Sequence, residues 1–228
     1  MANPLAFPSG VNIMISGQTQ SGKTFFTANL LKNCDRVFKH PPTCILYYYK
    51  HYQDLYRELE DALGQRIRFK DKLPSEEELV HELAEIREQH KSEKCHFVVC
   101  ADDWMDQIYK NKLFLDLVTR LAHHENISNI FLVQEGSITG AFKRDLLNNL
   151  HGNIYMANCR DRSSLRQLAI LLSDYKCIME AYDYCCKGGR GSYLMIMTHP
   201  EFDQALKYST KILDPEGPII FQSRKQMN

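Results

Sequence analysis

The fold of this chain is set by residues 11–31, VNIMISGQTQSGKTFFTANLL. The apolar opening, residues 11–16, predicts a buried strand, and residues 22–33 carry apolar residues at helical spacing. Between strand and helix, residues 17–24 read GQTQSGKT and match the pattern G-x-x-x-x-G-K-[ST] in full. That pattern is typical of a phosphate-binding loop. The alternative is a chance glycine turn before a helix, and the match of all eight positions and both flanks argues against it.

Each position of this loop has a reason in phosphate chemistry. Gly17 and Gly22 permit backbone conformations and a close approach that a Cβ atom would obstruct. Successive backbone N–H groups then hold phosphate oxygens at the positive end of the following helix. We expect Lys23 to bridge the β- and γ-phosphates and the Thr24 hydroxyl to ligate Mg²⁺. The residues expected to bind the nucleotide are Gly17, Gln18, Thr19, Gln20, Ser21, Gly22, Lys23, Thr24 and Phe25.

The rest of the chain repeats the alternation of strand and helix. Further strands are predicted at residues 43–49, 67–69, 96–101, 129–133, 153–157 and 192–198, with helices between most of them. Ser75 and Glu78 have capping-box spacing and open a helix that runs to about residue 90. The pattern predicts an α/β fold, a mostly parallel sheet flanked by helices on both faces. We expect one domain over residues 1–228, with a core of about 10–200 and a partly irregular tail over 201–228.

Two other predicted strands end in residues suited to nucleotide hydrolysis. Asp102 and Asp103 follow the apolar run 96–101, and ligands gather at the carboxyl edge of such sheets. Asp102 is expected to hold Mg²⁺ directly or through water, and Asp103 to orient and deprotonate the attacking water. The alternative is that both aspartates cap the next helix. Gln134 ends the run 129–133 and is expected to contact the γ-phosphate or that water; alone it would be an ordinary strand-end residue.

The composition narrows the class of protein. Apolar residues make up 44% and charged residues 25%, which are average values for globular proteins and exclude wholesale disorder. No run approaches the roughly 18 apolar residues of a membrane helix, and the first residues do not resemble a secretion signal. Eight cysteines without a C-x-x-C pair indicate neither a zinc nor a redox motif. Lys and Arg number 28, as do Asp and Glu, so DNA binding cannot rest on net charge.

The residues alone leave several kinds of nucleotide enzyme open. A small GTPase needs an Asn-Lys-x-Asp motif, and the nearest segment, residues 111–114, reads NKLF and lacks the aspartate. A nucleoside or small-molecule kinase stays open, because Arg160, Arg162 and Arg166 can form an arginine-bearing lid. About 80 residues separate the phosphate loop from Asp102, which indicates an inserted strand as in the additional-strand ATPases.

Four segments carry a resemblance to one superfamily. VNIMISGQTQSGKTFFTANLL, CADDWMD, RLAHHENISNIFLVQEG and NNLHGNIYMANCRDRSSLRQLA occur in that order, over residues 10–172. Together they resemble the genome-packaging ATPases of the FtsK–HerA superfamily. The resemblance is strongest to those of Polinton/Maverick elements and related eukaryotic double-stranded DNA viruses, with poxvirus packaging ATPases as relatives. It implies an ATP-hydrolysing motor that uses ATP and Mg²⁺ to move double-stranded DNA into a capsid. Most such motors have Asp-Glu where this chain has Asp-Asp, so Asp103 departs from the pattern.

The same resemblance implies an assembly. Such motors are homo-oligomeric rings, pentamers or hexamers, in which an arginine of the neighbouring subunit stabilises charge on the transferring phosphoryl group. Arg160 or Arg162 is our candidate, and the alternative is an ordinary ion pair. A ring needs positive charge only on the loops that face its channel, so a neutral subunit does not exclude a DNA motor.

The remaining expectations concern partners and place. A capsid or portal component is the implied protein partner, and no membrane is expected. The implied location is intracellular, at a virus assembly site in the host nucleus or cytoplasm or in the virion, and not secreted. Besides the kinase, the open alternative is a nucleotide-dependent assembly scaffold without mechanical work.

Overall fold

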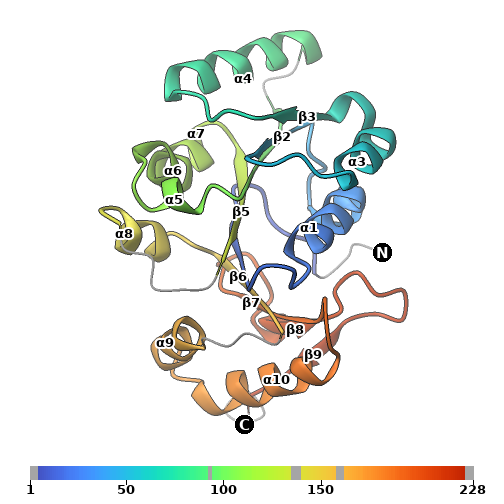
Figure 1. Cartoon of the computed structure of the whole chain (residues 1–228), viewed down its shortest axis with the longest axis vertical. Helices are drawn as coiled ribbons and strands as arrows, with labels where there is room; N and C mark the ends of the chain where they lie inside the picture. The colour runs from blue at the N-terminus through green and yellow to red at the C-terminus, as the bar shows by residue number, and fades with distance from the viewer. Residues whose placement is uncertain (1–4, 92–93, 135–139, 158–161, 224–228) are drawn as a thin grey trace.

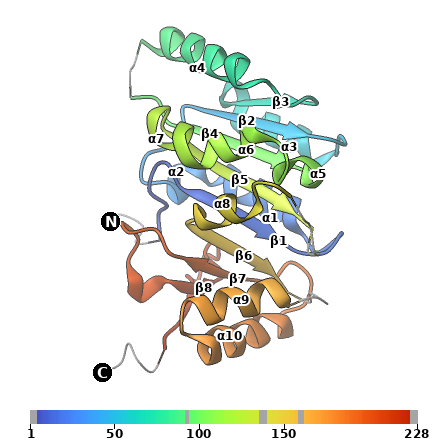
Figure 2. The ribbon, with the colours of Figure 1, turned by 90° about the vertical axis from the view of Figure 1, so that its left-hand side faces the viewer.

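The computed structural model describes residues 5–91, 94–134, 140–157 and 162–223, and among them nine strands form one sheet (Figure 1). The order across the sheet is β3-β2-β4-β5-β1-β6-β7-β8-β9. The strands are β1 Asn12–Ser16, β2 Cys44–Tyr49, β3 Ile67–Lys70, β4 Phe97–Asp102, β5 Ile127–Val133, β6 Gly152–Met156, β7 Tyr193–Met197, β8 Tyr208–Thr210 and β9 Ile219–Phe221. Figure 2 shows this order running from β3 near the top to β8 near the bottom.

Six neighbouring strands, from β3 through β6, pair in parallel, and β7, β8 and β9 continue the sheet antiparallel. The parallel strands are runs of buried apolar residues, as expected for a sheet covered on both faces. The predicted fold class, a mostly parallel sheet with helices on both faces, is therefore confirmed. In the sheet, β5 is inserted between β1, which leads into the phosphate loop, and β4, which ends in Asp102. The long spacing along the chain from the loop to Asp102 is filled by β2 and β3 with their helices.

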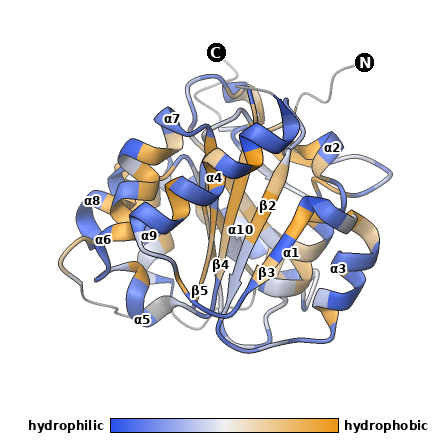
Figure 3. Ribbon diagram, turned by 90° about the horizontal axis from the view of Figure 1, so that it is seen from above, coloured by the Kyte–Doolittle hydropathy of each residue, from blue (hydrophilic) through white to orange (hydrophobic). Residues whose placement is uncertain are grey.

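Helices cover both faces of the sheet, as Figure 3 shows. Alternate residues of β1 serve the two cores: Ile13 and Ile15 pack in one with α1, α2 and α3, and Met14 packs in the other with α4, α5, α6 and α8. A third cluster packs α9 and α10 against β6, β7 and β8. The α-helices are α1 Lys23–Lys32, α2 Cys34–Val37, α3 Leu55–Leu63, α4 Glu76–His90, α5 Met105–Ile108, α6 Lys112–Asp116, α7 Ala122–His124, α8 Lys143–Asn148, α9 Ser163–Leu171 and α10 Tyr175–Lys187.

The helix predicted from 111 to 124 is interrupted. It consists of α6, a π-helical turn over Leu117–Leu121, and α7. Asparagines on the central strands meet the carbonyls of this turn: Asn129 Nδ2 donates to Leu117 O at 3.1 Å, and Asn12 Nδ2 donates to Val118 O at 2.9 Å. The side-chain amides thus donate hydrogen bonds to carbonyls of the turn, at the point where the helix changes from α to π geometry.

The capping box before α4 is confirmed. Ser75 Oγ accepts from the Glu78 N–H at 3.2 Å, and Glu78 Oε2 accepts from the Ser75 N–H at 2.7 Å. Within residues 201–223, β8 and β9 extend the sheet, although the polar composition of this segment predicts no strand. Two short 3₁₀ turns, Gly64–Arg66 and Gln204–Leu206, complete the elements. Within the described ranges, no helix combines the length and the apolar character that a membrane crossing requires.

Candidate active site

The phosphate loop leaves β1 at its carboxyl end and turns tightly into α1. Gln20 and Gly22 have positive φ angles of 63° and 102°, in the left-handed region. A Cβ atom on Gly17 would lie 2.6 Å from Ser21 Oγ and 2.7 Å from Met156 Cβ. Glycine is therefore required at position 17 by close packing and is favoured at position 22 by the backbone.

The amine of Lys23 is held against this loop. The residue is 8% exposed, and its Nζ donates to Gly17 O at 2.9 Å and to Gln18 O at 2.8 Å. The backbone N–H groups of the first turn of α1 lie in the same curve, because α1 begins at Lys23. The loop therefore brings a cation and helix-terminal donors to one place, which suits a phosphate group.

The carboxylate of Asp102 lies beside the loop and is almost fully buried, with 3% of the residue exposed. Its Oδ2 accepts from three hydroxyls: Tyr47 at 2.9 Å, Thr24 at 3.0 Å and Tyr56 at 3.3 Å. Burial raises the pKa of Asp102, and the neighbouring Asp103 adds to the rise, whereas these hydrogen bonds oppose it. A buried carboxylate with a raised pKa is the group that a nearby cation would stabilise most.

The donor set at this point fits Mg²⁺. Thr24 Oγ1 and Asp102 Oδ2 are 3.0 Å apart, and both are oxygen ligands of the kind that a small hard cation takes. The remaining positions of such an ion are normally filled by phosphate and water. Thr24 and Asp102 are the two residues that the sequence predicts as metal ligands, and the fold brings them together.

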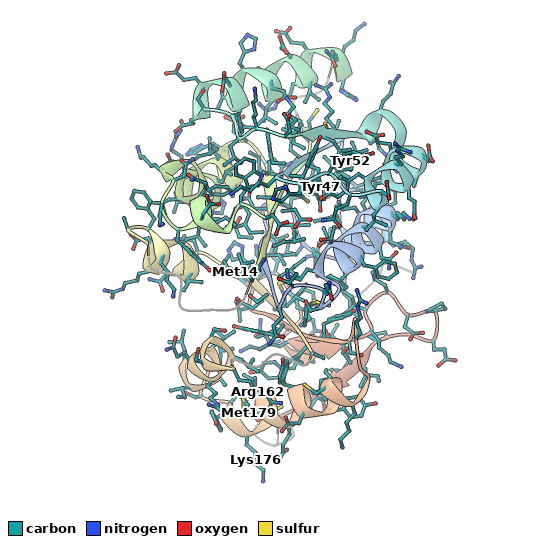
Figure 4. The ribbon with its side chains drawn as sticks, viewed as in Figure 1. Met14, Tyr47, Tyr52, Arg162, Lys176 and Met179 are labelled. Carbon is teal, nitrogen blue, oxygen red and sulfur yellow. The ribbon has the colours of Figure 1, made fainter. Side chains whose placement is uncertain are left out.

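The tyrosines around Asp102 were missed by the sequence analysis. Tyr47 lies in β2 and Tyr56 in α3, and their ring centroids are 5.1 Å apart. Phe69 stacks on Tyr56 at 4.9 Å and lies 5.1 Å from Tyr47. Figure 4 shows Tyr47 with Tyr52, another member of this aromatic cluster, in the upper half of the molecule. In the sequence, the only signal of this aromatic cluster is the run Tyr47-Tyr48-Tyr49. A tyrosine in a buried strand is usually a packing residue, so the run does not predict a contact with Asp102.

Asp103 and Gln134 share a cavity of about 320 Å³ with Lys23, Thr24 and Asp102. Asp103 has a φ angle of 64°, so a non-glycine residue is held in the left-handed region at the strand end. The carboxyl ends of β1, β4 and β5 therefore bring the predicted loop, aspartates and glutamine around one cavity. Gln53 and Arg190 also line it, and the sequence analysis named neither as a site residue.

Of the two arginines predicted to act on a neighbouring subunit, the described one, Arg162, does not line this cavity. Arg160 lies outside the described residues. Arg162 Nη1 lies 2.6 Å from Asp183 Oδ1, and its guanidinium packs 5.0 Å from the ring centre of Tyr182. Figure 4 shows Arg162 in the lower half of the molecule, away from Tyr47. Within its own chain, Arg162 therefore forms an ion pair, which is the alternative to a role in a neighbouring subunit.

Comparisons with known proteins bear on family and fold. Residues 7–158 match the family model described as Poxvirus A32 protein. No curated protein sequence matches the chain.

Among solved structures, the chain is similar to the genome packaging NTPase B204 from Sulfolobus turreted icosahedral virus 2 in complex with ATP-gammaS. The TM-score is 0.54 at 11% identity, over 86% of this chain and 94% of that chain. It is also similar to B204, the DNA-packaging ATPase from Sulfolobus Turreted Icosahedral Virus, with a TM-score of 0.54 at 12% identity, over 83% of this chain and 93% of that chain. At such identities the likeness shows a shared fold.

Proposed function

This chain belongs to the poxvirus A32 protein family, and we propose that it is an ATP-hydrolysing motor that moves double-stranded DNA into a capsid. The observation that carries the proposal is the single cavity that gathers the phosphate loop, the buried Asp102, Asp103 and Gln134. Further support comes from the fold, which is shared with a genome packaging NTPase that binds ATP-gammaS. Family membership is consistent with the resemblance to poxvirus packaging ATPases, and the relation to Polinton/Maverick elements stays a prediction.

In this proposal each residue of the cavity has one task. The loop N–H groups and Lys23 bind the β- and γ-phosphates of ATP, and Thr24 with Asp102 would hold Mg²⁺. When bound, Mg²⁺ neutralises charge that develops on the phosphate oxygens. Asp103 accepts a proton from the attacking water, and Gln134 orients that water. Tyr47 and Tyr56 hold the Asp102 carboxylate in place through its Oδ2.

The same proposal includes the assembly. One ATPase domain over residues 1–228 forms a homo-oligomeric ring, with Arg160 or Arg162 acting on the ATP of a neighbour and with a capsid or portal component as partner. The net charge of zero supports a binding surface for DNA that exists only in the ring, where each basic side chain of the channel is repeated once per subunit. Its place of action is an intracellular site of virus assembly.

The decisive experiment measures ATP hydrolysis with and without double-stranded DNA, together with particle mass. We expect hydrolysis to be stimulated by DNA and to be abolished by Lys23→Ala. Phosphate transfer to a nucleoside without any response to DNA would instead identify a kinase, and nucleotide-dependent rings without turnover would identify a scaffold.

A mixing experiment tests the neighbouring arginine. Arg162→Ala subunits mixed with Lys23→Ala subunits should regain activity if Arg162 acts in trans, because each variant then supplies what the other lacks. Arg160→Ala is tested in the same way, and failure of both mixtures counts against an arginine at either position.

A further inference from the structure

A second, larger cavity lies directly beside the phosphate cavity. Its volume is about 610 Å³, and it lies between α1, the carboxyl end of α10 and the turn that leads into β7. Its walls include Phe25 and Phe26 of α1, Tyr184 of α10, Tyr193 of β7, and the basic residues Lys187 and Arg190. A cavity of this size whose walls combine aromatic rings with a few charged groups is typical of small-ligand sites.

We propose that this second cavity binds the base and ribose of the nucleotide whose phosphates lie on the loop, and that Arg190 pairs with the phosphate next to the ribose. The proposal rests on the proposed function for its triphosphate and adds where the rest of the nucleotide goes. Neither the loop motif nor the family match assigns this part of the chain, because Tyr184 and Arg190 lie after residue 158, where the family match ends.

The two cavities are continuous through two shared residues. Phe25 and Arg190 line both of them. Phe25 follows Thr24 directly and is 61% exposed, which is unusual for a phenylalanine that has buried neighbours in the same helix. An exposed aromatic face next to the phosphates is suited to contact a nucleobase or ribose, since bases stack on such rings.

A glycine-rich turn delivers Arg190 to this boundary. Gly189 and Gly191 flank it with φ angles of 77° and 86°, which residues with a Cβ rarely adopt. The turn also touches the phosphate loop, because a Cβ on Gly22 would lie 3.3 Å from Gly191 Cα. The turn therefore places an arginine next to the loop, although the two segments are far apart in the sequence.

The charge of Arg190 is available for a ligand. The side chain is exposed, and the structure gives it no hydrogen bond or ion pair with any described residue. Lys187 and Lys211 stand on the rim of the same cavity, and the rim carboxylate of Asp214 lies 3.8 Å from Lys211 Nζ. The rim is thus cationic overall, which suits an anionic nucleotide, and a guanidinium matches a phosphate in two-pronged fashion.

The test separates the two halves of the nucleotide. Equilibrium binding is measured for ATP, for AMP, which carries base, ribose and one phosphate, and for inorganic tripolyphosphate, which carries neither base nor ribose. We expect Tyr184→Ala to weaken AMP and ATP binding roughly tenfold, the scale of a lost base-stacking contact, and to leave tripolyphosphate binding unchanged. Arg190→Ala should weaken AMP binding to a similar degree, and Lys23→Ala should weaken tripolyphosphate far more than AMP.

Matched controls keep the result interpretable. Tyr175→Ala removes a tyrosine of similar exposure, 47% against 49%, from the same helix but outside the cavity, and should change nothing. Tyr184→Phe preserves the ring, including its 5.5 Å contact with Phe221, and should bind AMP as the unchanged chain does. Photolabelling of the unchanged chain with 8-azido-ATP should place the label at Phe25 or between residues 184 and 193.

Three results overturn the proposal. They are unchanged AMP and ATP binding in both Tyr184→Ala and Arg190→Ala, an equal loss of tripolyphosphate binding in Tyr184→Ala, and a photolabel elsewhere in the chain. Failure of the proposed function has a different signature, since ATP hydrolysis by the unchanged chain would then be absent or would not respond to double-stranded DNA, whereas the binding results for Tyr184→Ala and Arg190→Ala would stand.

Discussion

At the carboxyl ends of β1, β4 and β5, polar side chains face a cavity, whereas at the amino ends of the same strands they face one another. The carboxyl-end group contains a buried charge. Asp102 is desolvated, its pKa is raised, and its neighbour Asp103 is a second carboxylate in a left-handed conformation. This arrangement opposes folding and favours a cation that enters.

The amino-end group is neutral and linked by hydrogen bonds, although the buried Asn129 Oδ1 has no hydrogen-bond partner among the described residues. Asn129 Nδ2 donates to Asn12 Oδ1 at 2.8 Å, and both asparagines also donate to the π-helical turn. His96, before β4, has its Nδ1 2.7 Å from His40 O and its Nε2 2.9 Å from Ser128 Oγ. A carbonyl only accepts, so Nδ1 carries the proton and the neutral ring accepts from the serine.

Stability and chemistry are thus located at opposite ends of the same strands. Buried polar groups that satisfy one another fix the fold, and buried polar groups turned to a cavity await a ligand. Substitutions at the two ends should therefore separate activity from stability.

The largest effect is expected from Asp102→Asn. We expect hydrolysis to fall at least about a hundredfold, because even residues one shell away from a metal cost 10–100-fold. The ligand-free chain should nevertheless become more resistant to unfolding at neutral pH, since burial raises the pKa of Asp102 and its charged form therefore weakens the fold. This gain should shrink as the pH falls through the raised pKa toward 3.8, where even an exposed aspartate is half protonated. An ATPase assay checks the loss of hydrolysis, and thermal unfolding measured across pH checks the gain in stability. A less stable Asp102→Asn chain at pH 7 would contradict the expectation that the charged carboxylate weakens the fold.

Asn129→Ala should do the opposite. Asn129 is fully buried, and its loss leaves the Leu117 carbonyl and Asn12 Oδ1 without their donor. We expect the free energy of unfolding to fall by about 2–4 kcal/mol, with kcat unchanged below the unfolding transition. Denaturant titration measures the first and steady-state hydrolysis the second. Asn153→Ala, at a half-buried position on β6, is the control and should cost far less.

At neutral pH the smallest effect is expected from His96, whose titration at the amino end matters only in acid. Burial lowers the pKa of His96 from 6.5 to about 4, so the unfolded chain takes up a proton that the folded chain does not. Stability from this group is full above pH 6.5 and is lost as the pH falls toward 4, by at most about 1.4 kcal/mol per pH unit. His96→Gln should reduce the slope of the free energy of unfolding against pH, between pH 6.5 and 4, by the amount that one bound proton contributes. Parallel curves for the two chains would show that His96 is not the source.

The sequence predicts that the phosphate loop, Asp102 and Gln134 meet at the carboxyl ends of the strands, because each of these parts is local in the sequence. The phosphate loop lies within eight consecutive residues, and Asp102 and Gln134 each end an apolar run whose direction a parallel sheet dictates. Tyr47 and Tyr56 could not be found in this way, because a hydroxyl aimed at Asp102 depends on how α3 packs on β2. The same holds for Arg190, which a turn brings to the loop from more than 150 residues away along the chain.

The fold was predicted less completely where elements are short or irregular. β8 and β9 have three residues each and too little alternation to stand out in a polar segment. The π-helical turn has the same apolar content as a regular helix, so the sequence does not distinguish it from one. Its position follows instead from contacts across the core with asparagines of β1 and β5. Arg162 is tied to Asp183 by a contact that sequence spacing does not specify.

The central position of β1 also affects how the chain is made. Of the nine described strands, β1 leaves the ribosome first, yet both of its neighbours, β5 and β6, come more than 100 residues later. At translation rates of about 5–20 residues per second, its apolar side chains wait on the order of 10 s for a partner strand. During that time the nucleotide cannot help the chain to fold, since the loop has no sheet to rest on. A nascent chain stopped before residue 127 should therefore bind chaperones, and ATP should not stabilise it.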